Sequence, residues 1–151
     1  FVGGWSLMGW IHGRAPEYFA FERWMLGWLD DDQIACHTDG EVVVELTALE
    51  SEGTTKAVVV PLSATRALVV ESRRALGQDY TLIEVGALVY VVDTGIYSGE
   101  GTITVLPHPG GEVFKYDAPL AAGESLEYEG VTVTVLEAGE QGDRIQISIA
   151  P

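Results

Sequence analysis

Ala87-Leu88-Val89-Tyr90-Val91-Val92 is the stretch that decides the fold. It is apolar at every position and rich in β-branched and aromatic residues, which are favoured in strands. A strand that is apolar on both faces has to be covered above and below. We therefore expect these residues to form a central strand of a sheet that is buried on both sides.

Further strands are expected before and after this one. Short runs rich in β-branched residues are bounded by Gly, Ser, Thr, Asp or Pro, as is typical of strands joined by turns. These runs are 41–49, 57–61, 67–71, 102–106, 131–135 and 145–149. The last two alternate apolar with polar residues and are joined by a turn-rich loop, which predicts a terminal antiparallel hairpin.

The fold class expected from this pattern is mainly β, an antiparallel β-sandwich preceded by one aromatic-rich α-helix. A parallel sheet would need crossover helices, and no helical pattern follows residue 32. We assign the sandwich to residues 37–151 and the helix to a separate segment, 1–36. The breakers at 107–111 are the best internal boundary. They leave open whether the strands form two sheets of one sandwich or two subdomains.

The N-terminal segment carries all four tryptophans and both methionines. A helix is expected from Pro16 to Leu29, because proline suits a first helical position and Glu17 suits the positive end of the helix dipole. Such a helix would be apolar nearly all round and would need cover on more than one side. We therefore expect it to contact a partner. The expected interface residues are Trp10, Phe19, Trp24 and Trp28.

The charge of the chain excludes some functions. The formal net charge is −15, and such a surface repels phosphate backbones, so no nucleic-acid partner is expected. No apolar run has the roughly 18 residues of a membrane span, so no membrane-spanning segment is expected. The acidic turn Asp30-Asp31-Asp32 is interpreted as solvated surface, with calcium binding as a minor alternative. Cys36 is the single cysteine, so no internal disulfide can form.

Catalytic and metal-ligating patterns are absent from the sequence. No H-E-x-x-H motif occurs, and His12 and His108 stand apart from other ligand types. Cys36 and His37 are adjacent, which would point their side chains to opposite faces of an extended segment. Ser6 lies in a Gly-x-Ser-x-Met sequence that lacks the second glycine of a nucleophile elbow. By itself, this chain is therefore not expected to be an enzyme, to hold a metal or to need a cofactor.

Two adjacent arginines follow the strand expected at 67–71. Arg73 and Arg74 could form exposed ion pairs, which contribute little to stability. One of them could instead be buried in a bidentate carboxylate pair that stabilises the sandwich. Asp93, at the end of the central strand, is the partner that we expect for such a pair.

Several motifs occur in an order that is similar to a known family. Trp5-Ser6-Leu7-Met8-Gly9 is followed by the aromatic helix with its Leu26-Gly27-Trp28-Leu29 sequence. Val-Pro-Leu-Ser at 60–63, Val-Val-Glu-Ser-Arg at 69–73 and Leu-Val-Tyr-Val-Val-Asp-Thr at 88–94 come later. Over residues 1–107 this order resembles the secreted zinc metallopeptidases typified by immune inhibitor A and its bacterial relatives.

The resemblance implies that Trp5 and Met8 belong to a methionine-containing turn beneath a zinc site, and that His12 lines a substrate cleft. Because the zinc-binding helix is missing, zinc is implied only for a longer parent protein, which would be a metalloendopeptidase. Residues 1–36 would then be the remnant of a protease-like domain. The location implied is secreted or on the bacterial cell surface.

Two functions follow as expectations. The first is a non-catalytic C-terminal portion of a metallopeptidase-like protein, a β-sandwich that stabilises an upstream protease-domain polypeptide or orients its substrate. The second is a self-sufficient extracellular β-sandwich for adhesion, carbohydrate binding or assembly, in which the aromatic helix packs against another copy of the chain.

Overall fold

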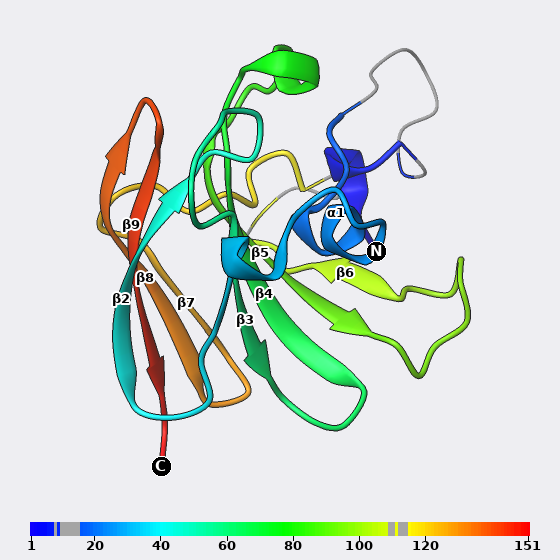
Figure 1. The fold of residues 1–151 in the computed structure, drawn as a ribbon, viewed down its shortest axis with the longest axis vertical. Helices are drawn as coiled ribbons and strands as arrows, with labels where there is room; N and C mark the ends of the chain where they lie inside the picture. Colours follow the sequence, from blue (N-terminus) through cyan, green and yellow to red (C-terminus); the bar gives the residue numbers. More distant parts are fainter. Residues whose placement is uncertain (8, 10–15, 109–110, 112–114) are drawn as a thin grey trace.

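The computed structural model of the chain describes residues 1–7, 9, 16–108, 111 and 115–151. Nine strands form two sheets that face each other, as Figure 1 shows. The five-stranded sheet has the order β1-β3-β4-β5-β6. Its strands are β1 (Ile34–Cys36), β3 (Ala57–Pro61), β4 (Arg66–Arg73), β5 (Gly86–Asp93) and β6 (Ile103–Val105). The expected mainly-β sandwich class is confirmed.

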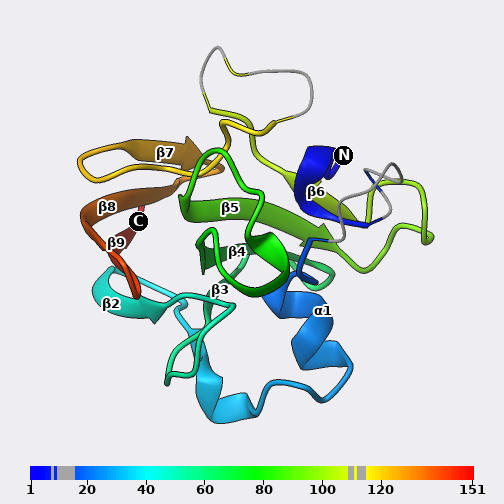
Figure 2. The ribbon, with the colours of Figure 1, turned by 90° about the horizontal axis from the view of Figure 1, so that it is seen from above.

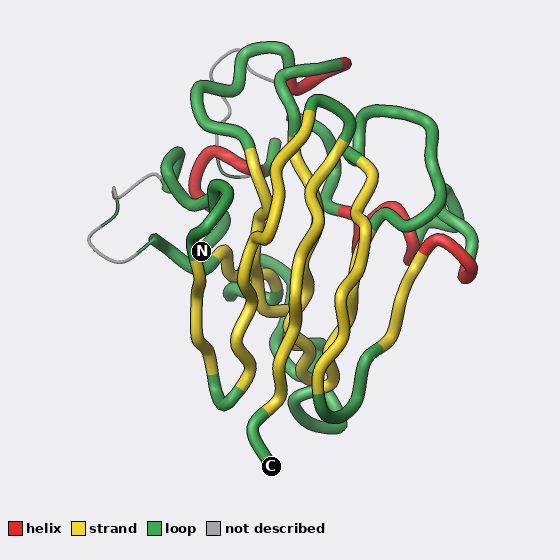
Figure 3. The backbone as a smooth tube through the Cα atoms, turned by 90° about the vertical axis from the view of Figure 1, so that its left-hand side faces the viewer, coloured by secondary structure: helices red, strands yellow, loops and turns green. Residues whose placement is uncertain are grey.

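The four-stranded sheet has the order β2-β9-β8-β7, and all of its neighbouring strands are antiparallel. It consists of β2 (Glu41–Thr47), β7 (Ser125–Tyr128), β8 (Val131–Gly139) and β9 (Gly142–Ile149). The predicted terminal hairpin is confirmed as β8 and β9. Figure 3 looks onto this sheet, with its strands side by side and the C-terminus just beyond β9.

Strand β5 is covered on both faces, as its sequence predicts. Residues 86–92 are all buried. Ala87, Val89 and Val91 point into the core between the two sheets. Leu88, Tyr90 and Val92 point to the other face, where they pack with the N-terminal segment. The molecule therefore has three layers, with the five-stranded sheet in the middle (Figure 2).

The strand pairing differs from the grouping that the breakers suggest. Strand β2 lies far from β9 in sequence, yet it pairs with it over its whole length, from Glu41↔Ser148 to Thr47↔Gly142. The boundary at 107–111 therefore does not separate the two sheets. Residues 34–36, which the sequence places with the helix, form edge strand β1 and pair in parallel with β3.

Helix α1 (Ala20–Met25) is much shorter than the expected Pro16–Leu29, so that prediction is wrong at both ends. Phe19 has extended backbone angles, and the helix begins after it. Gly27 has a φ of +71°, the left-handed conformation that commonly ends a helix. Trp28 N–H then donates to the Arg23 carbonyl at 2.8 Å. The described residues also form three short 3-10 turns, Gly3–Trp5, Asp31–Gln33 and Gly77–Asp79.

No helix among the described residues combines the length and the apolar character that crossing a bilayer requires.

The two-sheet core predicts a clear contrast between two aliphatic truncations in the four-stranded sheet. Ile147 is fully buried between the sheets, whereas Val43 on neighbouring β2 is 44% exposed. Ile147→Ala is expected to lower the free energy of unfolding by roughly 2–5 kcal/mol because it leaves a cavity. Val43→Ala is expected to change it by less than about 1 kcal/mol. Urea unfolding followed by tryptophan fluorescence measures both, and equal losses would contradict the packing.

Candidate functional site

The end of strand β4 connects all three layers. Successive side chains of a strand point to opposite faces, so Glu71 and Arg73 face the N-terminal segment while Ser72 and Arg74 face the four-stranded sheet. All four are buried. This alternation gives the sequence Glu-Ser-Arg-Arg two separate sets of partners.

Arg73 is the centre of a buried ionic cluster. Its Nη1 lies 2.9 Å from Glu71 Oε1, and its Nε lies 2.6 Å from Asp79 Oδ2 and 3.3 Å from Glu50 Oε1. All four side chains are completely buried. The guanidinium also lies 5.5 Å from the centroid of the Trp5 ring, a cation–π contact.

The ionic cluster fastens the backbone of the N-terminal segment to the sheet. Glu71 Oε2 accepts hydrogen bonds from Ala20 N–H and Tyr90 O–H, both at 2.7 Å. The Tyr90 oxygen in turn accepts Phe21 N–H at 3.2 Å. These acceptors satisfy amides of the first helical turn that have no partner within the helix. Side chains of the sheet therefore determine where α1 begins.

Burial changes the proton affinity of the clustered groups. It raises the pKa of Glu50 to about 8, and a hydrogen bond with Asp79 adds to the shift. It also raises the pKa of Glu71, against the opposing effect of Arg73. Burial alone would lower the pKa of Arg73, but the attraction of the surrounding carboxylates outweighs it and raises that pKa. Because these groups are enclosed and bonded to one another, the cluster is a structural anchor rather than a reaction centre.

Arg74 and Ser72 connect β4 to the opposite layer. Asp143 on β9 accepts from Ser72 Oγ and from Arg74 Nη2, both at 2.7 Å. Asp93, the expected partner of a buried arginine, lies instead 4.0 Å from Arg66 Nε. The prediction of a buried arginine pair is thus correct, and its partner is wrong, because β4 ends at the opposite end of β5 from Asp93.

A groove of about 810 Å³ lies over α1. It is lined by residues of α1 and its flanks, by residues within 94–103, from the end of β5 to the start of β6, and by Phe1, Val2 and Ser6. Most of the side chains that line it are apolar, and several are well exposed: Met25 by 68%, Leu26 by 54% and Phe1 by 69%. The apolar or aromatic lining residues include Phe1, Tyr18, Phe21, Met25, Leu26 and Ile96.

The aromatic residues predicted to meet a partner are divided by the fold. Phe19 is fully buried within the chain and packs against Tyr90, with 4.8 Å between ring centroids, so it is not a surface residue. Trp5 is likewise buried. Trp24 is half-buried and donates from Nε1 to Asp31 at 2.8 Å. Trp28 is 60% exposed and meets Tyr18 edge to face.

The remaining predicted site residues are those of the methionine turn, the substrate cleft and a possible metal site. Met8, Trp10 and His12 lie outside the described residues. Cys36 is exposed, and His37 Nε2 lies 3.3 Å from the Gly40 carbonyl. Among residues that the structure describes, no three or more His, Cys, Asp or Glu side chains gather as a metal site would require.

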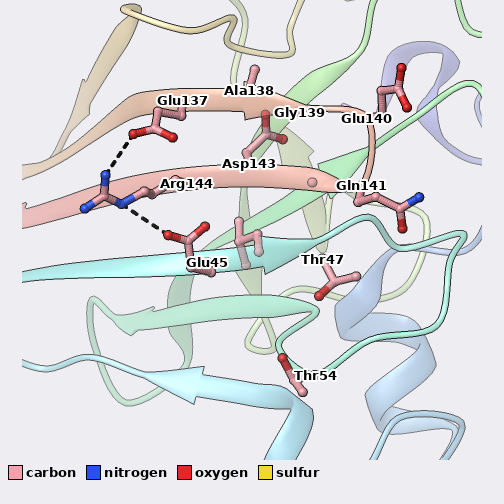
Figure 4. A pocket seen from close by; sticks show the side chains of 12 residues that line it. Glu45, Thr47, Thr54, Glu137, Ala138, Gly139, Glu140, Gln141, Asp143 and Arg144 are labelled. Carbon is pink, nitrogen blue, oxygen red and sulfur yellow. Dashed lines mark hydrogen bonds and ion pairs between the residues drawn. The ribbon is translucent and has the colours of Figure 1, made fainter.

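A second hollow, of about 500 Å³, lies at the end of the β8–β9 hairpin (Figure 4). Arg144 lies between Glu45, at 3.1 Å, and Glu137, at 2.9 Å. These side chains are well exposed, and ion pairs of this kind contribute little to stability. The hollow holds no grouping suited to catalysis, so the groove over α1 is the better candidate site.

Comparison of this chain with protein families, curated proteins and solved structures finds no match.

Sequence reasoning missed Glu50 and Asp79 in the cluster and residues 94–103 in the groove. A partial signal was present, because Glu71 and Arg73 are two apart on a strand and must share a face. The other partners come from loops whose approach depends on the sheet pairing, and no local pattern reveals it.

Substituting Arg73 tests whether the buried ionic cluster stabilises the fold. Arg73→Ala leaves the buried acidic side chains of Glu50, Glu71 and Asp79 without their arginine, so we expect it to lower the free energy of unfolding by roughly 3–5 kcal/mol. Arg144→Ala, which removes an exposed arginine, is the matched control and is expected to cost far less. Denaturant titration compares them. Similar losses for the two variants would show that the cluster does not hold the layers together.

The raised pKa of Glu50 predicts a dependence of stability on pH. An acid whose pKa is higher in the folded than in the unfolded protein favours folding while it is protonated. Its stabilisation is therefore complete below the ordinary value of 4.5 and is lost as pH rises toward about 8. Glu50→Gln should flatten this part of the profile of unfolding free energy against pH. An unchanged slope in the variant would exclude Glu50 as its source.

Proposed function

We propose that this chain is a non-catalytic β-sandwich module that binds another polypeptide through the groove over α1. The observation that carries the proposal is the set of exposed apolar side chains on and beside α1, above all Met25, Leu26 and Trp28. Contiguous exposed apolar surface of this kind marks interaction sites in folded proteins.

The anchoring of α1 supports a binding role. A helix of six residues is not stable by itself in water, and here the sheet holds its first turn through Glu71 and Tyr90. A surface that is already ordered avoids much of the entropy cost of association. The groove therefore offers a partner a preformed wall.

The resemblance to secreted zinc metallopeptidases suggests the identity of that partner. We propose the upstream protease-domain polypeptide, with this module stabilising it or orienting its substrate outside the cell. The zinc would belong to that polypeptide, because this chain has no H-E-x-x-H sequence. A second copy of the chain is a poorer occupant, since two surfaces with a net charge of −15 repel each other.

Site-specific photo-cross-linking tests the proposal. A photoreactive residue at Leu26 should capture, in the native source, a polypeptide segment that contains an H-E-x-x-H motif, and a further Met25→Asp substitution should abolish capture by placing a charge in the apolar contact. The same probe at Val43, on the other side of the molecule, is the control. Capture only of another copy, or equal capture from both positions, would contradict the proposal.

A further inference from the structure

Glu22 provides the only charged side chain among the described residues that line the groove. It lies on α1 between the apolar wall residues Phe21 and Met25. The other described lining side chains are apolar, hydroxylic or absent, as in glycine. The groove therefore combines an apolar surface with a single negative charge.

The carboxylate of Glu22 is only partly satisfied by the residues that the structure describes. Its Oε2 accepts Phe19 N–H at 3.1 Å, and no described residue donates a hydrogen bond to Oε1. Partial burial raises its pKa, and the nearby Glu71 adds to the effect. A cation that approaches from the open side of the groove would stabilise the charged form of this carboxylate.

Three cations around α1 and Phe1 are already engaged. Arg23 follows Glu22 in sequence but pairs with Glu17 and donates to the Leu49 carbonyl. Lys115 donates to the carbonyls of Phe1 and Val105. Arg73 is enclosed in the ionic cluster beneath the helix. The described part of the chain thus supplies no cation that pairs with Glu22.

We propose that the segment bound in the groove is basic and amphipathic. A lysine or arginine of this segment pairs with Glu22, and its large apolar side chains cover Met25 and Leu26. This inference rests on the proposed function and adds the chemistry of the partner. Charge complementarity points to it, because a segment with a positive charge is attracted both by Glu22 and by the strongly acidic chain as a whole.

Two synthetic peptides of equal length test this chemistry, one amphipathic and built from leucine and lysine, the other with glutamate in place of lysine. Isothermal titration calorimetry at physiological salt should show binding of the lysine peptide and none of the glutamate peptide. Glu22→Gln should weaken binding of the lysine peptide roughly tenfold or more, since a hydrogen bond to a charged group is lost. The glutamine oxygen can still accept the Phe19 N–H, so α1 retains its first turn.

Glu140→Gln is the charge-matched control, because it removes one exposed carboxylate at the far hairpin and should leave the affinity within about twofold. Glu22→Lys should gain binding of the glutamate peptide, which a merely structural role for Glu22 would not produce. Equal weakening by the Glu22 and Glu140 variants would overturn the inference, because the peptide would then be attracted by the net negative charge of the chain and not by Glu22 itself.

A Met25→Asp variant separates this inference from the function on which it rests. If Met25→Asp abolishes binding but both peptides bind the wild type equally, the groove docks a partner whose charge is irrelevant, and only the present inference fails. If Met25→Asp leaves binding of the lysine peptide unchanged, the groove is not the docking surface, and both proposals fail.

Discussion

Arg73 is the group on which the arrangement of the three layers depends. It is wholly buried and meets acidic side chains from β4, the loop through Glu50 and the turn at Asp79, while the Trp5 ring and the Glu17 carbonyl of the N-terminal segment also contact its guanidinium. Removing one partner of a buried ion pair is costly, because the other charge is left without compensation. The cluster therefore favours a single arrangement of these four segments.

The same end of β4 also reaches the opposite layer. Because side chains alternate along a strand, Ser72 and Arg74 bind Asp143 on β9 while Glu71 and Arg73 hold the N-terminal segment. Four consecutive residues thus tie the middle sheet to both of its neighbours. The apolar cores on the two faces supply most of the burial, and these polar contacts connect the layers at this end of β4.

The surface that results has two properties that suit binding of a partner. Helix α1 is short, yet it is held by acceptors from the sheet. Met25 at its end, and Leu26 and Trp28 just after it, are exposed to solvent. Glu22 adds the one charged side chain found among the described residues that line the groove. In the proposed role, apolar side chains supply the burial on which affinity depends, and the carboxylate selects partners by their charge.

The sequence by itself determined seven of the nine described strands, all but β1 and β7, together with the buried character of Ala87–Val92 and the terminal hairpin. Alternation and β-branched composition are local properties that follow directly from the geometry of a strand. It also located the aromatic segment, although it overestimated the length of the helix there. Only the tertiary structure decided that β2 joins β9, that Arg73 meets Glu50 and Asp79, and that Phe19 is buried while Trp28 is exposed. Those outcomes depend on contacts between residues far apart in the chain, and their energies are set by burial and charge compensation that exist only once the layers have packed.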